Sequence, residues 1–85
     1  MDAVTSQVKS FILERFLPGE DPANLTATVP LISGRILDSL ATLEVVSYIE
    51  TQFGIELQAH EVDVERLDTL ERITALINGK KGAAA

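Results

Sequence analysis

The sequence contains no cysteine, and this absence excludes several kinds of chemistry. No disulfide can support the fold, and no protein thiol can act as a nucleophile or a metal ligand. Any thiol that the function needs must therefore be imported. Glycine and proline are also few, with five and three residues, and 46% of the residues are hydrophobic. This composition is typical of an ordered globular protein rather than a disordered one.

Basic residues are scarce as well. Seven lysines and arginines stand against thirteen acidic residues, which gives a formal net charge of −6. Such a charge repels nucleic acid phosphates and an anionic membrane surface, so we expect neither as a partner. Basic protein surfaces are the more natural partners. The charge and the small size also favour a monomer.

Long hydrophobic runs are absent. No apolar stretch approaches the roughly 20 residues that cross a bilayer, and the first residues lack the basic start and apolar run of a signal peptide. We therefore expect a cytoplasmic protein. The 85 residues make one small domain. A domain of this size buries roughly 60–65% of its unfolded surface and is too small for a deep active site, so any chemistry is expected at the surface.

Apolar residues recur at helical spacing in the first two thirds of the chain. The first predicted helix covers Val4–Phe16 and ends near the Pro-Gly pair at residues 18–19. The second covers Leu40–Phe53 and is closed by Gly54, where a left-handed residue costs little. No segment shows the two-residue alternation of a strand, which favours an all-α fold.

The last predicted helix covers residues 69–78. Asp68 and Glu71 have capping-box spacing at its start, with Asp in place of Ser or Thr. Gly79 is expected to end it, and the two lysines that follow suit the carbonyl end of the dipole. We therefore expect one domain of residues 1–79 and a frayed tail of residues 80–85.

The connections between these helices complete the predicted fold, a four-helix bundle with a long first loop and a short third helix. The third helix is expected as a turn at residues 60–62, followed by a bend that reaches Leu67. The first loop, residues 18–37, has about 20 residues where helix pairs usually need 2–8, and such loops tend to be functional or separately anchored. Its expected anchors are Leu25, Val29, Leu31, Ile32 and Ile36.

The second helix has two apolar faces, because residues three, four and seven apart share a side of a helix. The face expected in the core comprises Val45, Val46, Ile49 and Phe53. The other comprises Leu40, Leu43 and Ser47, flanked by Glu44 and Glu50. Its leucines either pack inward against the long loop or stay exposed as a docking patch rimmed by carboxylates. The exposure of Leu43 distinguishes the two.

Asp38 and Ser39 lie at the start of the second helix. Asp and Ser at such a position are most often caps, whose side-chain oxygens accept hydrogen bonds from free amides of the first turn. A hydrolase serine is the alternative, but Ser39 lacks the glycines of a G-x-S-x-G elbow, and nothing places His60, the only histidine, beside it. We therefore expect no catalytic residue. The sequence also contains no cluster of metal ligands and no glycine-rich phosphate loop.

Residues 31–57 contain a specific combination of motifs. These are an Asp-Ser-Leu triplet at residues 38–40, a glycine a few residues upstream, a Leu-Glu-x-Val run and a Glu-x-x-Phe-Gly-Ile-Glu ending. The combination resembles the phosphopantetheine-attachment domain of acyl carrier proteins, and with the flanking helices the resemblance extends from about Val4 to Ile77. It implies the four-helix fold and a 4′-phosphopantetheine group, taken from coenzyme A, joined to Ser39 as a phosphodiester.

The attachment of an anion at this position agrees with the physics of helices. A phosphodiester at a helix N-terminus meets unpaired amides and the positive end of the dipole, which is worth roughly 0.3–1 kcal/mol at an exposed site. The missing cysteine also fits, since a carrier needs one thiol, on its arm. By the resemblance, Asp38 helps a phosphopantetheinyl transferase and its Mg²⁺ to recognise the site. An acyl- or aminoacyl-loading ligase and downstream biosynthetic enzymes are the other implied partners.

The sequence departs from the carriers of fatty-acid synthesis. Ala41 replaces the acid that usually follows the triplet, so docking should depend more on Leu40 and Leu43 than on carboxylates. Residues 31–50 are closer to discrete carriers such as the D-alanyl carrier, or to carriers loaded by adenylating ligases. Fatty-acid, polyketide and related secondary-metabolite biosynthesis stay open. The alternatives to a carrier are an unmodified interaction module that docks through the two leucines, and a hydrolase.

Overall fold

The structure is a computed structural model that describes the backbone of residues 3–84 and the side chains of residues 3–81. Its elements, in chain order, are α1 (Ala3–Phe16), the 3-10 turn η1 (Pro22–Asn24), α2 (Ser39–Phe53), the 3-10 turn η2 (Ala59–Glu61), α3 (Val64–Leu67) and α4 (Leu70–Ala84). The described residues contain four α-helices and no strand. The predicted all-α, four-helix fold with a short third helix is therefore confirmed.

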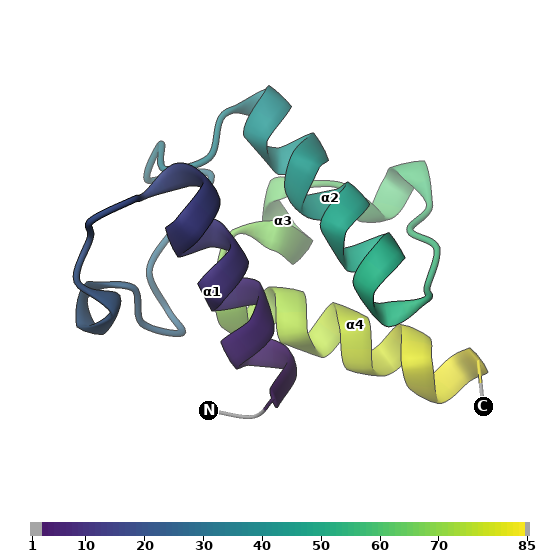
Figure 1. Ribbon diagram of the computed structural model, residues 1–85. Helices are drawn as coiled ribbons and strands as arrows, with labels where there is room; N and C mark the ends of the chain where they lie inside the picture. Colours follow the sequence, from purple (N-terminus) through teal and green to yellow (C-terminus); the bar gives the residue numbers. More distant parts are fainter. Residues whose placement is uncertain (1–2, 85) are drawn as a thin grey trace.

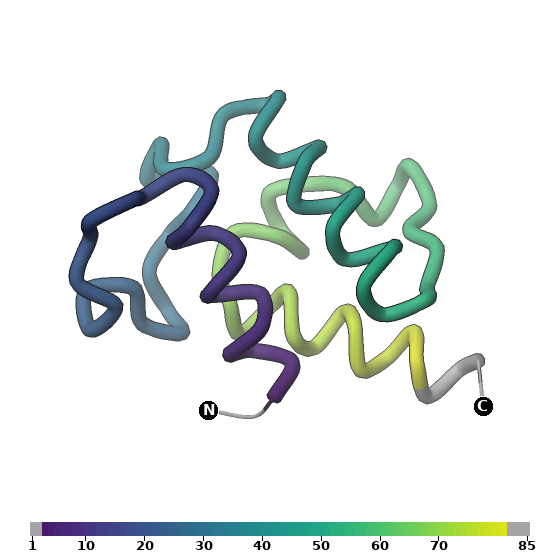
Figure 2. Tube along the Cα trace, viewed as in Figure 1, coloured from purple at the N-terminus to yellow at the C-terminus, as the bar shows by residue number. Residues whose placement is uncertain are grey.

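The three long helices pack on one another, and the short α3 packs on α4. Figure 1 shows α1 and α4 crossing, with α2 lying above α4 and α3 between them. The long first loop swings out from the end of α1 and returns to the start of α2 (Figure 2). None of the helices in residues 3–84 is long and apolar enough to cross a membrane.

The core receives side chains from the helices and from the long loop. Its most deeply buried members, each at most 2% exposed, are Val8, Ile12, Leu25, Leu31, Leu37, Val45, Ile49, Leu67, Leu70, Ile73 and Ile77. Leu25 and Leu31 were expected as loop anchors, and the other three expected anchors are partly buried against the same core. Phe11 of α1 stacks on Tyr48 of α2, with ring centroids 4.1 Å apart. The loop is therefore part of the folded domain. Its buried side chains fix the position of the segment that leads into α2.

The predicted end of the last helix is wrong, because α4 continues past Gly79 to Ala84. A glycine inside a helix costs only about 1 kcal/mol relative to alanine. Contacts beyond it oppose that cost: Lys80 forms an ion pair of 2.7 Å with Glu61, and the ammonium of Lys81 lies 5.7 Å from the ring centroid of Phe53. The division into a domain of residues 1–79 and a tail stays a prediction. Residue 85 lies outside the described residues.

Two other predictions about the end of the chain are corrected by the structure. The expected bend before Leu67 is the helix α3, whose first turn is capped by Asp63 through a 2.9 Å hydrogen bond from the Arg66 amide. The cap of α4 is the hydroxyl of Thr69, which accepts from the Arg72 amide at 3.1 Å. Asp68 therefore does not cap α4, and its carboxylate is used elsewhere.

Candidate functional site

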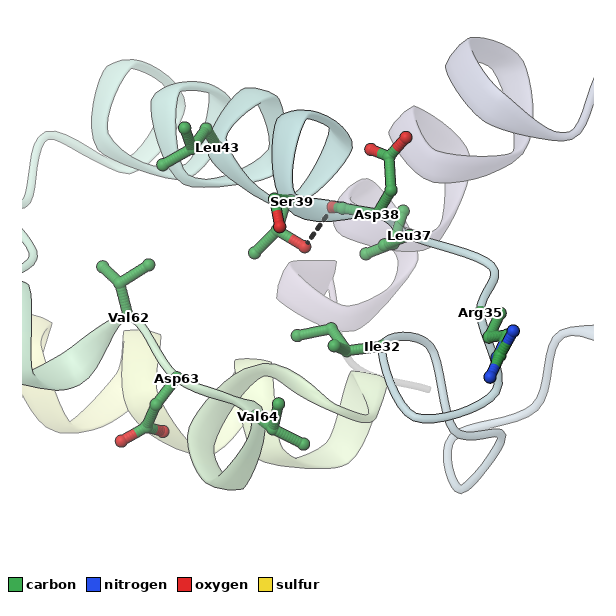
Figure 3. Close-up of a pocket in the computed structure, with 10 residues that line it drawn as sticks. Ile32, Arg35, Leu37, Asp38, Ser39, Leu43, Val62, Asp63 and Val64 are labelled. Carbon is green, nitrogen blue, oxygen red and sulfur yellow. Dashed lines mark hydrogen bonds between the residues drawn. The ribbon is translucent and has the colours of Figure 1, made fainter.

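The first turn of α2 is capped by Asp38 and not by Ser39. The Asp38 carboxylate accepts a 2.7 Å hydrogen bond from the amide of Ala41, and its extended backbone is typical of an N-cap. Its carbonyl oxygen accepts from the hydroxyl of Thr42 at 2.8 Å, the dashed line in Figure 3. Ser39 is the first residue of the helix and is exposed. Its hydroxyl makes no hydrogen bond to any residue from 3 to 81.

An open groove of about 630 Å³ lies beside Ser39. Its lining comes from the loop before α2, the first turns of α2, and the segment that leads into α3: Ile32, Arg35, Leu37, Asp38, Ser39, Thr42, Leu43, Val62, Asp63 and Val64. Figure 3 shows Ser39 and Leu43 on one side of the groove and Val62 and Val64 on the other. Five of the ten lining residues are apolar, and three carry charged groups. The groove could therefore accept an aliphatic chain beside the serine.

Sequence reasoning missed the segment of residues 62–64 as part of this site. It lies more than 20 residues beyond Ser39 in the chain, and the packing of α3 on α4 determines where it is placed. The only signal in the sequence was that Val62 and Val64 are apolar residues outside the three long predicted helices. In the structure Val64 is 47% exposed. His60, in η2, is exposed and does not line the groove. The described residues also contain no group of three or more side chains suited to hold a metal ion.

The outer face of α2 exposes its two leucines. Leu40 is 69% and Leu43 is 56% exposed, so the interpretation in which they pack inward is wrong. Ser47 of the same face is exposed as well. On the opposite face the expected core residues Val45, Val46 and Ile49 are buried, and Phe53 is partly buried against them. Ala41, which sequence reasoning treated only as a missing acid, is also buried.

The two carboxylates that flank this outer face are engaged within the chain. Glu44 forms an ion pair of 2.6 Å with Arg15 of α1. Glu50 accepts a 2.9 Å hydrogen bond from the amide of Leu57, which follows the end of α2. The Arg15 pair is largely exposed and contributes little to stability. Even so, it places a positive charge beside Glu44, so the surface around the leucines is less acidic than the sequence suggests.

The chain enters α2 through a tight turn at residues 31–37. The amides of Ile36 and Leu37 both donate to the carbonyl of Leu31, at 2.9 and 2.8 Å. Arg35 has a φ of 64°, in the left-handed region that non-glycine residues seldom adopt. A Cβ atom on Gly34 would clash with the carbonyl oxygen of Pro30, so this position requires glycine. The turn is therefore compact and partly strained.

Asp68, between α3 and α4, holds this turn in place. One of its carboxylate oxygens accepts hydrogen bonds from the amides of Ile32 and Ser33, at 2.9 and 2.8 Å, and the other accepts from the Ser33 hydroxyl at 2.7 Å. Asp68 is only 9% exposed. The hydrogen bonds from Ser33 and Ile32 and the positive charge of Arg72 lower the pKa of this carboxyl group below its ordinary value, against the opposing effect of burial.

No protein-family model matches the chain. Individual proteins do: the chain is 31% identical over 81 residues to an acyl carrier protein of Thermotoga maritima, and the match covers 95% of both chains. It is 40% identical over 68 residues to a mitochondrial acyl carrier protein of Neurospora crassa, which covers 73% of this chain and 50% of that protein. The first match spans nearly the whole of both proteins, including all four helices. The chain therefore belongs to the acyl carrier protein family.

Proposed function

We propose that this protein is a carrier that holds acyl intermediates as thioesters on a 4′-phosphopantetheine arm attached to Ser39. The observation that supports this most directly is the exposed Ser39 hydroxyl, which makes no hydrogen bond to any described residue because Asp38 supplies the cap of α2. A serine that served only as a cap would have its oxygen engaged by the amides of the first turn. Family membership supports the carrier role in general terms.

The residues around Ser39 fit a phosphodiester arm. The amides of Ser39 and Leu40 have no acceptor among the described residues, and they lie at the positive end of a 15-residue helix. A phosphate on the serine oxygen would meet those amides, which favour an anion. The apolar groove beside Ser39 offers a surface for the aliphatic part of the arm or its cargo. When bound, the group supplies the thiol that this cysteine-free chain lacks.

The other functional residues are assigned by the same proposal. Asp38, next to the attachment site, contributes to recognition by a phosphopantetheinyl transferase. Leu40 and Leu43 bind the transferase, the loading ligase and the downstream enzymes by apolar contact, with Ser47, Glu44 and Glu50 at the border of that surface. In this role the chain performs no catalysis, works as a monomer in the cytoplasm, and serves fatty-acid, polyketide or related secondary-metabolite biosynthesis.

Intact-mass measurement tests this function. The purified chain is incubated with coenzyme A, Mg²⁺ and a broad-specificity phosphopantetheinyl transferase. We expect a gain of one phosphopantetheinyl group on the wild type, none on Ser39→Ala, and a full gain on the control Ser10→Ala, which removes an exposed hydroxyl from α1. An unmodified wild type, or a modified Ser39→Ala, would contradict the proposal.

A second candidate is an unmodified interaction module. The exposure of Leu40 and Leu43 favours it, since exposed leucines in a small domain often mark a binding surface. It predicts that chain isolated from its native host has no added mass and binds its partner at full strength. A thioester-linked acyl group on the native protein would exclude this candidate.

A further inference from the structure

The groove beside Ser39 is lined by the first turns of α2 and by two other segments that lie far apart in the chain. One wall is the turn of residues 31–37, which contributes Ile32, Arg35 and Leu37. The other is the segment of residues 62–64, which lies across the groove from Ser39 and Leu43 and leads directly into α3. The first turns of α2 complete the lining. Neither of the other two segments is a long helix, so their relative position depends on the contacts that join them.

Asp68 joins them. It follows directly on the last residue of α3, and its carboxylate accepts all three hydrogen bonds from Ile32 and Ser33 on the opposite wall. Its carbonyl oxygen accepts a further hydrogen bond from the amide of Leu31. Three residues further along, in the first turn of α4, the amide of Glu71 donates to the carbonyl of Ala27 at 3.0 Å. The junction between α3 and α4 is thus bonded to the long loop at several points.

Because Asp68 is buried, these hydrogen bonds matter for the stability of the folded chain. A buried carboxylate is costly unless donors surround it, and it can only accept hydrogen bonds. Hydrogen bonds to an ionised group are about twice as strong as neutral ones. The turn that these bonds hold contains Arg35 in a left-handed conformation and a glycine packed against Pro30. Because this backbone is strained, we expect the turn to change conformation when the bonds to Asp68 are lost.

We propose that Asp68 is a positioning residue for the attachment site. By holding the amides of Ile32 and Ser33, it fixes the turn that forms one wall of the groove and that delivers the chain to Asp38 and Ser39. This inference rests on the proposed function of Ser39. Asp68 is not among the residues that line the groove, and it acts only through the turn.

Amide hydrogen exchange on the unmodified protein tests the structural half of the proposal. In Asp68→Ala, we expect the amides of Ile32 and Ser33 to exchange about tenfold faster or more, because each loses its acceptor. The amide of Ala41, bonded to Asp38, should keep its wild-type rate and serves as the internal control. Asp68→Asn should restore protection, because an amide oxygen can still accept both bonds and its NH₂ can donate to the Ser33 hydroxyl.

Transfer kinetics test the functional half. For modification of Ser39 by the transferase, we expect Asp68→Ala to raise KM about fivefold to tenfold with little change in kcat, as expected when the recognised surface is displaced rather than the reacting groups. Asp68→Asn should return KM to within about twofold of wild type. Asp68→Asn restores only the hydrogen-bonding capacity of the side chain. If Asp68→Ala acted through a general loss of stability, Asp68→Asn would not restore both the protection of the two amides and the KM.

The outcomes separate this inference from the proposed function. If the wild type gains no phosphopantetheine, the proposed function fails, and the exchange rates still decide whether Asp68 holds the turn. Slow exchange at Ile32 and Ser33 in Asp68→Ala, or a KM equal to wild type despite fast exchange, would overturn the inference. Should Asp68→Ala not fold, Ser33→Ala removes only the 2.7 Å hydroxyl bond. A smaller acceleration confined to the amides of Ile32 and Ser33 is then expected, and unchanged rates would refute the proposal.

Discussion

Asp38 is assigned two roles that a pair of substitutions can separate. Its carboxylate caps α2 through the Ala41 amide, and the proposed function also uses it for recognition by the transferase. Asp38→Ala removes both the cap and the charge. Asp38→Asn keeps a side-chain oxygen that can accept from the same amide and removes only the charge. The two variants should therefore differ in stability and agree in modification.

The magnitudes follow from the geometry of the cap. Loss of an N-cap hydrogen bond costs about 0.5–2 kcal/mol, and loss of a negative charge at a helix N-terminus costs about 0.3–1 kcal/mol at an exposed site. We expect Asp38→Ala to lower the free energy of unfolding by about 1–2 kcal/mol and Asp38→Asn by about 0.5 kcal/mol. In a domain of this size, a loss of 1 kcal/mol lowers Tm by about 4–8 °C.

Urea denaturation monitored by circular dichroism measures the stabilities, and intact mass against time measures the modification of Ser39. We expect both variants to be modified at least about tenfold more slowly than wild type, since each loses a charged contact worth about 1.5–3 kcal/mol. Asp38→Asn modified at the wild-type rate would show that the transferase does not use the carboxylate. Asp38→Ala as stable as wild type would refute the assignment of Asp38 as the cap.

Two further predictions concern the docking surface and Asp68. Leu43→Asp should change the free energy of unfolding by less than about 0.5 kcal/mol, because the side chain is exposed. It should raise the KM of the transferase several-fold, whereas Ser10→Asp, a charge added at an exposed position of α1, should not; an equal effect of the two would count against docking through Leu43. Since the pKa of Asp68 is lower in the folded state, its stabilising effect is present above the ordinary value of 3.8 and is lost as the pH falls through the folded pKa. Urea titrations from about pH 6 down to about pH 2.5 should show a smaller loss of stability in Asp68→Asn than in wild type, and equal losses would contradict this.

The features that could be predicted from the sequence are those encoded within a few residues. The local signals of α2 are its stripe of apolar residues, Asp38 before the stripe and Gly54 after it. The helix runs between Asp38 and Gly54 as expected, and Gly54 has a φ of 64°. The exposure of Leu40 and Leu43 was left open by the sequence. A second apolar face on a helix can pack against a loop or face solvent, and only the path of the loop decides between these.

The errors share a physical cause, which is that long-range contacts outweighed a local preference. Glycine intrinsically favours the end of a helix, yet α4 continues past Gly79. The residues after it, Lys80 and Lys81, make contacts with Glu61 and Phe53 of other elements. Asp63 and Thr69 supply the caps that sequence reasoning either overlooked or gave to Asp68. Each competing effect is about 1 kcal/mol, so a single distant partner is enough to reverse the outcome.

Asp68 illustrates why part of the site could not be predicted. An aspartate before an apolar helical segment has the same pattern whether it caps that helix or accepts hydrogen bonds from a distant turn. The two roles are distinguished only by the folded position of Ile32 and Ser33, which lie 36 and 35 positions earlier in the chain and donate their amides to Asp68. The hydrogen-bonding requirements of the turn and of a buried carboxylate are complementary, since one has free donors and the other only acceptors. The residue that holds the turn beside Ser39 thus lies outside every motif that points to Ser39 as the proposed attachment site.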